Sequence, residues 1–272
     1  MRHQASGNYT QRPRNGCQLE PGNQKQVESD CDQIFYNLVD PRSMEHPPDY
    51  LLEKREPIIS LTDRLSTCYT GAVYDVLRAK GYPSQTLPAY IRPLNIQQVV
   101  AGPVFTIEGK RDDSLTEHQS LLKWCELLSK APANTVLVCQ PNDHALAHMG
   151  ELSAKTLAYK KVLGYIVDGG CRDSASIERI GFPVFCKYFT PVDIVGKWAA
   201  TTFGKPVKIG DVVVHIGDYV LADRDGIVVI PGEIVDEVVT ATETVLQKEN
   251  LVSKAILQGM DPVKAYLAYG KF

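Results

Sequence analysis

The feature that most constrains the fold is an alternation of two hydrophobic periods in the middle of the chain. Three segments with helical spacing are each followed by a short apolar run rich in β-branched residues. The helical segments are residues 117–130, 151–161 and 174–180, and the apolar runs are residues 135–139, 164–168 and 183–186. Strands that alternate with helices of this length predict right-handed βαβ units around a sheet with parallel strands. The sequence therefore predicts an α/β fold.

The flanking segments add further elements to this sheet. Residues 61–81 carry apolar side chains at helical spacing and predict one or two helices. Residues 99–107 predict a strand whose Gly-Pro pair marks a bulge or an edge. Residues 207–230 contain short strands separated by Gly-Asp turns, a pattern typical of β-hairpins, and a long amphipathic helix is predicted over residues 233–258. Together they indicate a mixed sheet with flanking helices, a hairpin subdomain and a C-terminal helix.

The first 48 residues differ from the rest in composition. They are rich in Gln, Asn, Gly, Pro and Arg and show little hydrophobic periodicity before residues 32–38. Such a segment offers few apolar groups to offset the entropy cost of ordering. We therefore expect residues 1–48 to form a flexible or loosely docked extension and residues 49–272 to form the domain.

Composition excludes several classes of function. Lys and Arg number 29 against 32 Asp and Glu, a net charge of −3, which gives no basic footprint for nucleic acid or an anionic membrane. No apolar run approaches the roughly 18–20 residues of a membrane span, and the first 16 residues lack the apolar core of a signal peptide. The seven cysteines are scattered without a CxxC pair, so we expect free thiols in the cytoplasm.

Two segments stand where ligands bind in open α/β sheets, beyond the carboxyl ends of strands and near helix N-termini. Residues 142–153 lead into a helix, and residues 168–173, with the sequence DGGCRD, join a strand to the next helix. Their glycines let backbone amides approach a small anion. Arg172 offers a planar fork of donors for a carboxylate, and Asp173 offers an anionic oxygen for a hard cation.

Structural interpretations of the same residues stay open. Asp173 could cap the helix that begins at Ser174, and Arg172 could pair with a nearby carboxylate; spacing alone favours these interpretations over catalysis. His144 and His148 have the i,i+4 spacing of a zinc helix, but no third ligand stands at a familiar spacing. Cys171 has no histidine near it in sequence and is interpreted as an inert small residue.

The chain after its extension resembles the RraA-like family, which includes 4-hydroxy-4-methyl-2-oxoglutarate aldolases, oxaloacetate decarboxylases and regulators that bind ribonuclease E. The similar pieces keep their order over most of residues 49–272. They are Leu65-Ser66-Thr67, Asp75, Gly81, Ile91-Arg92-Pro93, Ala101-Gly102-Pro103, Gly150-Glu151-Leu152, residues 168–173 (DGGCRD), residues 181–185 (GFPVF) and residues 222–231 (ADRDGIVVIP).

The resemblance implies a swivelling β/β/α-type fold and a pyruvate lyase that depends on Mg²⁺ or Mn²⁺. By this match Asp173 holds the metal, and Arg172 contacts the keto oxygen and stabilises the enolate of pyruvate. The backbone amides of Gly150, Glu151, Leu152 and Ser153 receive the substrate carboxylate. Glu151 also holds a metal-bound water, and such a water, poised by Glu151 or Glu249, can act as the base. No Schiff-base lysine is required.

The sequence departs from the family pattern at two of these positions, because Glu151 replaces an Asp and Ser153 replaces a Leu. The resemblance also implies a homotrimer or hexamer in which an acidic residue of the C-terminal helix, best matched by Glu249, reaches a neighbour's site. A non-catalytic binding protein of the ribonuclease E inhibitor type is the alternative function. A methyltransferase is set aside, because residues 168–171 lack the G-x-G spacing of a nucleotide-binding turn.

Overall fold

A computed structural model describes residues 60–271 of the protein. The expectation of a flexible extension over residues 1–48 therefore lies outside the described residues. In the part that the structure describes, no helix combines the length and the apolar character needed to cross a membrane.

Within residues 60–271, eight strands form one mixed sheet. They are β1 (Arg92–Pro93), β2 (Val100–Arg111), β3 (Val136–Gln140), β4 (Gly164–Val167), β6 (Val184–Cys186), β8 (Trp198–Phe203), β11 (Tyr219–Ala222) and β12 (Ile227–Ile230). Their order is β1-β6-β4-β3-β2-β11-β12, and β8 also pairs with β2. Strands β2, β3, β4 and β6 are parallel, whereas β1, β8, β11 and β12 pair antiparallel. The predicted α/β fold with a mixed sheet is confirmed.

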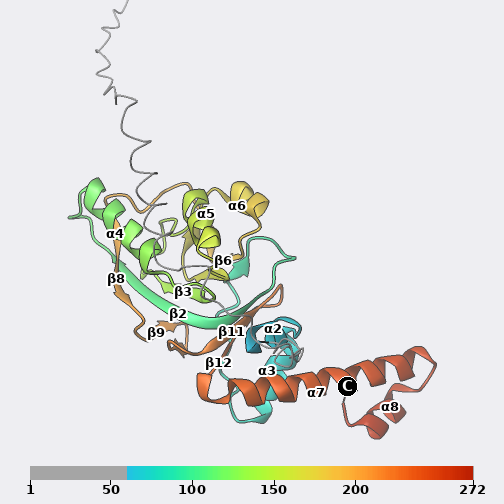
Figure 1. Ribbon diagram of the computed structural model, residues 1–272. Helices are drawn as coiled ribbons and strands as arrows, with labels where there is room; N and C mark the ends of the chain where they lie inside the picture. Colours follow the sequence, from blue (N-terminus) through green and yellow to red (C-terminus); the bar gives the residue numbers. More distant parts are fainter. Residues whose placement is uncertain (1–59, 272) are drawn as a thin grey trace, which may run out of the picture. The chain divides into compact units, whose positions relative to one another are not determined.

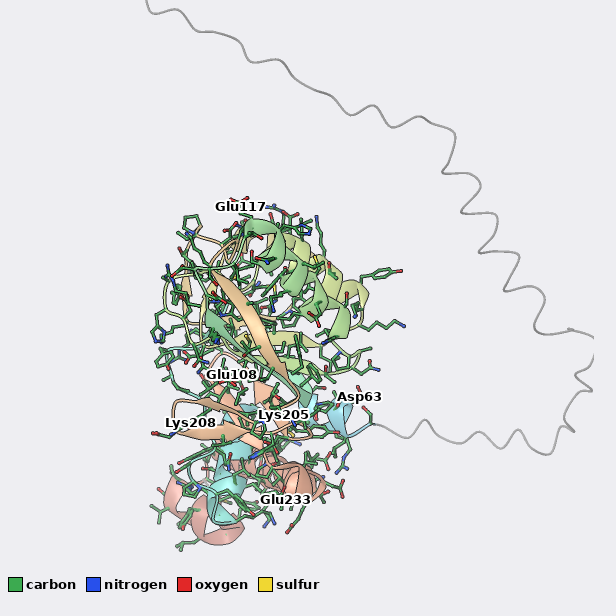
Figure 2. The ribbon with its side chains drawn as sticks, turned by 90° about the vertical axis from the view of Figure 1, so that its left-hand side faces the viewer. Asp63, Glu108, Glu117, Lys205, Lys208 and Glu233 are labelled. Atoms are coloured by element: carbon green, nitrogen blue, oxygen red, sulfur yellow. The ribbon has the colours of Figure 1, made fainter. Side chains whose placement is uncertain are left out.

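Helices cover both sides of this sheet. They are α2 (Leu61–Ser66), α3 (Thr70–Ala79), α4 (Glu117–Lys130), α5 (Glu151–Tyr159), α6 (Ser174–Ile180), α7 (Val235–Leu257) and α8 (Pro262–Tyr269). Figure 1 shows α4, α5 and α6 on one side of the sheet, with α2, α3 and α7 on the other side beside β11 and β12. In the perpendicular view of Figure 2, Glu117 at the start of α4 and Glu233 just before α7 lie at opposite ends, with Glu108 of β2 between them.

The central strand β3 shows why the sequences of the parallel strands are continuous apolar runs. Leu137 and Cys139 pack in the core beneath α4, α5 and α6. Val136 and Val138 point to the opposite face, where they pack against β9 (Val207–Ile209) and β10 (Val212–Val214). A parallel strand covered on both faces must be apolar at every position, so alternation is lost.

Local sequence signals explain some of the element boundaries. The side chain of Thr116 accepts a hydrogen bond from the amide of Gln119, whose own side chain accepts from the amide of Thr116, and this capping box starts α4 at Glu117. Helices α4 and α6 have the predicted bounds, and residues 61–81 form two helices, α2 and α3. The predicted helix over residues 233–258 begins as a 3-10 turn before α7. Strand β8 and helix α8 were not predicted.

One prediction about the strands is wrong, and a second is correct only in part. The hairpin of β11 and β12 is no separate subdomain, because β11 pairs with β2 and extends the main sheet; β9 and β10 alone form their own two-stranded sheet. Of the two interpretations of Gly102-Pro103, the bulge is wrong, because the register shift in β2 lies between Glu108 and Gly109. The edge is confirmed, because β2 pairs with β11 at these residues and with β3 only from Val104. A Cβ at Gly109 would stand 1.9 Å from the Trp198 indole, so the missing side chain makes room for that ring.

Candidate active site

Backbone hydrogen bonds join the two loops that follow β3 and β4. The amide of His148 donates to the carbonyl of Gly170 at 2.8 Å, and the amide of Arg172 donates to the carbonyl of Met149 at 2.9 Å. This short ladder places Gly150, which precedes α5, beside Arg172. The two segments that the sequence singled out therefore meet at one edge of the sheet.

Gly150 leaves room for a carboxylate at the start of α5. A Cβ at this position would lie 2.9 Å from Oδ2 of Asp173 and 3.3 Å from Cγ of Arg172. The Asp173 oxygen instead accepts a hydrogen bond from the amide of Glu151 at 3.1 Å. The first amides of a helix lack intrahelical partners and carry partial positive charge, so an anion is stabilised there.

The backbone of Asp173 directs its carboxylate toward α5. Its φ of 55° lies in the left-handed region, which Asp tolerates better than most residues. Although Asp173 stands immediately before α6, its side chain makes no capping hydrogen bond to that helix. The alternative interpretation of Asp173 as the cap of the helix beginning at Ser174 is therefore wrong.

Arg172 does pair with a carboxylate, as the structural interpretation expected. Its Nη1 donates to Oδ2 of Asp193 at 3.0 Å, and its Nε lies 3.6 Å from Oδ2 of Asp173. A guanidinium has five N–H donors, so the pair with Asp193 uses only part of its capacity. Sequence reasoning missed Asp193, because a lone Asp in the loop after β7 (Tyr188–Phe189) belongs to no motif or periodic pattern.

These groups line a cavity of about 310 Å³. The amide end of α5, Arg172, Asp173 and Asp193 form its polar part. The rest of the lining is mostly apolar and includes Trp124 of α4, a second residue that the sequence analysis did not single out. Its only sequence signal was a large aromatic within a helix of mostly polar composition.

The other residues predicted around Gly150 have separate roles. The carboxylate of Glu151 accepts a hydrogen bond from Nζ of Lys155 at 2.6 Å, and this contact lowers the pKa of Glu151. The side chain of Leu152 is exposed at the cavity mouth. Ser153 is buried, and its hydroxyl accepts a hydrogen bond from Nε1 of Trp124 at 2.9 Å. A leucine here could not accept that bond, so the departure from the family pattern fixes the indole.

Glu249 does not line this cavity in its own chain. It lies on α7, on the other side of the sheet from α5 and α6 (Figure 1). Its carboxylate accepts a hydrogen bond from the Tyr69 hydroxyl and pairs with Nζ of Lys271 at 3.2 Å.

The remaining candidates do not form a site of their own. Residues 141–150 are not helical, so His144 and His148 do not share a helix face. His144 is exposed, whereas His148 is fully buried with its ring edge-on to Trp198, 5.1 Å between centroids. Cys171 is buried, and its hydrogen bond with Cys186, together with burial, raises the pKa of its thiol. A thiol held in its protonated form is a poor nucleophile.

A larger cavity, of about 700 Å³, lies beside α3 and is lined partly by residues 210–212 and 225–228. Among its lining residues in the described chain, the charged side chains are Asp211 and Asp225, and no Lys, Arg or His is present. The larger cavity therefore lacks a cationic side chain among these residues, whereas the smaller one has Arg172 beside the start of α5. We therefore assign the candidate active site to the smaller cavity.

The donors at the smaller cavity fit a magnesium-like ion held mainly by water and substrate. Among residues 60–271, no group of three or more His, Cys, Asp or Glu side chains is arranged to hold a metal. Mg²⁺ keeps several waters and is usually bound through only one or two carboxylates together with substrate oxygens. Asp173, whose side chain is 43% exposed at the cavity, supplies a donor of this type.

Comparison with known proteins gives one family match. The RraA-like family model, described as Aldolase/RraA, matches residues 70–229. These residues include both loops of the candidate site.

Three relatives illustrate the similarity. Protein DlpA of Legionella pneumophila is 27% identical over 215 residues, which are 78% of this chain and 34% of DlpA, so the chain spans about a third of that protein. A Halalkalibacterium halodurans protein with the provisional name 4-hydroxy-4-methyl-2-oxoglutarate aldolase is 27% identical over 66% of this chain and 83% of its own length. Streptomyces coelicolor RraAS2, described as an unusual member of the RNase ES inhibitor RraA protein family, has a similar fold with a TM-score of 0.64, at 24% identity over 71% of this chain and 96% of its own.

Proposed function

Because the chain belongs to the RraA-like family, we propose that it is a divalent-metal-dependent lyase that cleaves a 2-oxo acid and releases pyruvate. One observation carries the proposal: the amide end of α5, Arg172 and Asp173 open onto a single cavity. The candidate reactions are aldol cleavage of substrates of the 4-hydroxy-4-methyl-2-oxoglutarate type and decarboxylation of oxaloacetate. Both reactions leave the same enolate of pyruvate.

The start of α5 supports binding of the substrate carboxylate. Backbone amides and the helix dipole attract an anion at this position, and Gly150 lets it approach closely. With the carboxylate bound there, the adjacent keto oxygen is directed toward the Arg172 guanidinium. The ion pair with Asp193 holds that guanidinium in place.

Arg172 would act where negative charge develops. When the bond between carbons 3 and 4 breaks, its electron pair moves onto carbon 3 and is shared with the keto oxygen as an enolate. In the aldol cleavage the 4-hydroxyl group loses its proton to a base that Glu151 or Glu249 would position. The enolate then takes up a proton at carbon 3 and becomes pyruvate. A preorganised donor at the developing oxyanion contributes about 2.7–4 kcal/mol.

The metal would be held by Asp173, and we expect Mg²⁺ or Mn²⁺. When bound, such an ion supplies positive charge that polarises a ketone and stabilises an enolate. The residues of this chain would share that task, because Arg172 lies beside Asp173 at 3.6 Å.

We also propose that the active form is a homotrimer or hexamer in which Glu249 reaches a neighbour's site. Two observations support it. Within its own chain Glu249 lies away from the cavity, and the same part of α7 exposes apolar side chains, among them Leu251 and Leu257. Exposed apolar groups on one helix end are typical of a contact surface, and closed symmetric assemblies are common.

The test is pyruvate release from 4-hydroxy-4-methyl-2-oxoglutarate and from oxaloacetate, measured with Mg²⁺, with Mn²⁺ and after exhaustive chelation. We expect turnover that disappears on chelation and returns when the metal is restored. Full activity after chelation would contradict the metal dependence. Absence of turnover with any 2-oxo acid and either metal would favour the alternative, a non-catalytic binding protein.

A further inference from the structure

The start of α5 leaves two backbone amides without a partner. Gly150 is the N-cap of α5 and has no side chain to accept a hydrogen bond, and Asp173 accepts only from the amide of Glu151. Among the described residues, no group accepts from the amides of Leu152 and Ser153. Helix α4 differs, because its N-cap side chain accepts from the amide of the third helical residue. Uncapped amides at the start of a helix attract an anion.

A hydroxyl group lies beside these amides. Ser153 is the third residue of α5, and side chains on an α-helix are tilted toward its N-terminal end. The residue lines the cavity, although it is only 8% exposed. Its Oγ accepts a hydrogen bond from Nε1 of Trp124 at 2.9 Å and donates none within the part of the chain that the structure describes. The hydroxyl proton of Ser153 is therefore available to a ligand in the cavity.

Trp124 restricts the directions in which this hydroxyl can donate. A serine hydroxyl has one donor and two acceptor lone pairs, and it rotates to suit its partners. The indole N–H occupies one lone pair, and the indole packs edge-on against Trp198, with 5.9 Å between ring centroids. Trp198 is fully buried, and its own Nε1 donates to the carbonyl of Pro141 at 2.7 Å. The hydroxyl is thus held before a ligand arrives, which lowers the entropy cost of binding.

Two carboxylates near this point are already paired with cations. Glu151 accepts from Nζ of Lys155 at 2.6 Å, and Asp193 accepts from Nη1 of Arg172 at 3.0 Å. A third carboxylate, that of Asp173, is the proposed ligand of the metal. The start of α5 therefore offers an anion two amides and a hydroxyl, beside a guanidinium that keeps other donors.

We propose that the Ser153 hydroxyl donates to the 1-carboxylate of the 2-oxo acid, next to the free amides of α5, and that Trp124 is the positioning residue of this hydroxyl. The inference rests on the proposed function and adds to it a side-chain contact. Leucine, the residue of the family pattern at position 153, cannot make this contact. Both candidate substrates carry the 1-carboxylate, and the product pyruvate keeps it, so the contact serves either reaction.

The first experiment separates KM from kcat in Ser153→Ala. The 1-carboxylate keeps its charge throughout the reaction, so a contact with it is equally strong before and in the transition state and affects KM. We expect KM for oxaloacetate and for 4-hydroxy-4-methyl-2-oxoglutarate to rise about tenfold, the effect of one hydrogen bond to a charged group, while kcat stays nearly constant. The matched control is Thr156→Ala, because the Thr156 hydroxyl also lies on α5 but donates to the carbonyl of Leu152 and lies outside the cavity.

Two results of this experiment would overturn the contact. An unchanged KM in Ser153→Ala would leave the hydroxyl as a structural partner of Trp124. A lower kcat at unchanged KM would place the hydroxyl at the developing enolate and not at the carboxylate. Urea unfolding of each variant is measured in parallel, so that a change in KM is compared only between folded proteins.

A double variant tests the positioning role of Trp124. Trp124→Phe keeps an aromatic ring and loses the N–H donor, so KM should rise in this variant as well. If Trp124 acts through Ser153, the same substitution should raise KM no further in a chain that already carries Ser153→Ala. Additive increases in the double variant would mean that the indole contacts the substrate itself, and the positioning role would be wrong.

Calorimetric binding of pyruvate in the presence of Mg²⁺ separates this inference from the lyase proposal. Binding that is weaker in Ser153→Ala than in the wild type and in Thr156→Ala, with no turnover of any substrate, would overturn the lyase and leave the contact standing. Pyruvate release by the wild type, with the same KM and the same affinity for pyruvate in Ser153→Ala, would overturn the contact and leave the lyase standing. A wild type that neither binds nor releases pyruvate would overturn both.

Discussion

Oδ2 of Asp173 accepts a hydrogen bond from the backbone amide of Glu151 at 3.1 Å, across 22 positions of sequence. The carboxylate that precedes one helix therefore caps the start of another. Its negative charge lies at the positive end of α5 and 3.6 Å from Nε of Arg172. Asp173 therefore has two roles: its carboxylate caps α5, and it is the proposed ligand of the metal. Substitutions can separate these two roles.

We expect Asp173→Asn and Asp173→Ala to differ in stability but not in activity. An asparagine oxygen can still accept from the Glu151 amide, so the free energy of unfolding should change by less than about 0.5 kcal/mol. Alanine loses the cap, which costs about 1 kcal/mol, and it tolerates the left-handed backbone of this position less well, which costs about 1 kcal/mol more. Both variants lose the charge proposed to hold the metal, so both should lose most turnover. Urea unfolding and pyruvate release measure the two effects; an active asparagine variant would contradict the metal role.

Arg172→Ala should remove most turnover and preserve the fold. Loss of one preorganised donor to a developing oxyanion lowers the rate roughly 10²–10³-fold. Arg172→Lys should fail as well, because the guanidinium pairs with Asp193 through Nη1 and keeps other in-plane donors for the substrate, an arrangement that a compact ammonium group lacks. Steady-state kinetics with a circular dichroism control measure this. Near-normal kinetics in the lysine variant would assign Arg172 to structure.

His148 should make the protein less stable in mild acid. Burial lowers its pKa from 6.5 to about 4, and neither ring nitrogen has a hydrogen-bond partner among the described residues. The unfolded chain binds a proton as the pH falls through 6.5, whereas the folded chain resists it until about pH 4. The free energy of unfolding therefore keeps its full value above pH 6.5 and decreases by about 3 kcal/mol as the pH falls to 4.

The measurement is the free energy of unfolding at several pH values between 7 and 4. His148→Leu should remove the part of the decrease in the free energy of unfolding at low pH that this ring causes. His144→Leu is the control, because His144 is exposed in the same loop. Equal pH profiles for the wild type and the His148 variant would contradict the prediction.

If subunits share the site, two inactive variants should complement each other. We would mix Asp173→Asn with Glu249→Gln after dissociation and reassembly. Some interfaces then receive an intact Asp173 from one chain and an intact Glu249 from the other, and activity partly returns. Full activity of a monomer, or no recovery despite proven subunit exchange, would leave Glu249 as a surface carboxylate bound to Tyr69 and Lys271.

Removal of residues 1–48 should leave turnover and melting temperature unchanged. The segment lacks core-forming periodicity and lies outside the family match over residues 70–229. A chain that starts at residue 49 keeps every residue of the candidate site. A loss of either property would mean that the segment docks on the domain or completes the site.

Regular and local signals in the sequence were enough for the parallel part of the sheet and for most of the helices that cover it. The alternation over residues 117–186 predicted the parallel part of the sheet, because β-branched runs and helical spacing report local backbone preference and burial directly. The start of α4 at Glu117 follows from its Thr116–Gln119 capping box, which acts over three residues. The DGGCRD motif also predicted Arg172 and Asp173 as candidate site residues.

Contacts between distant segments had to come from the tertiary structure. Asp193 and Trp124 join the cavity only because loops and helices far apart in sequence converge there, and neither carries a local pattern. Asp173 caps α5 and not α6, the helix that follows it in sequence, because its positive φ turns the side chain away from α6. The spacing of residues in the sequence predicts contacts within a few positions. Contacts with a distant helix end, ion-pair partner or cavity wall depend on how the sheet brings separate strands together.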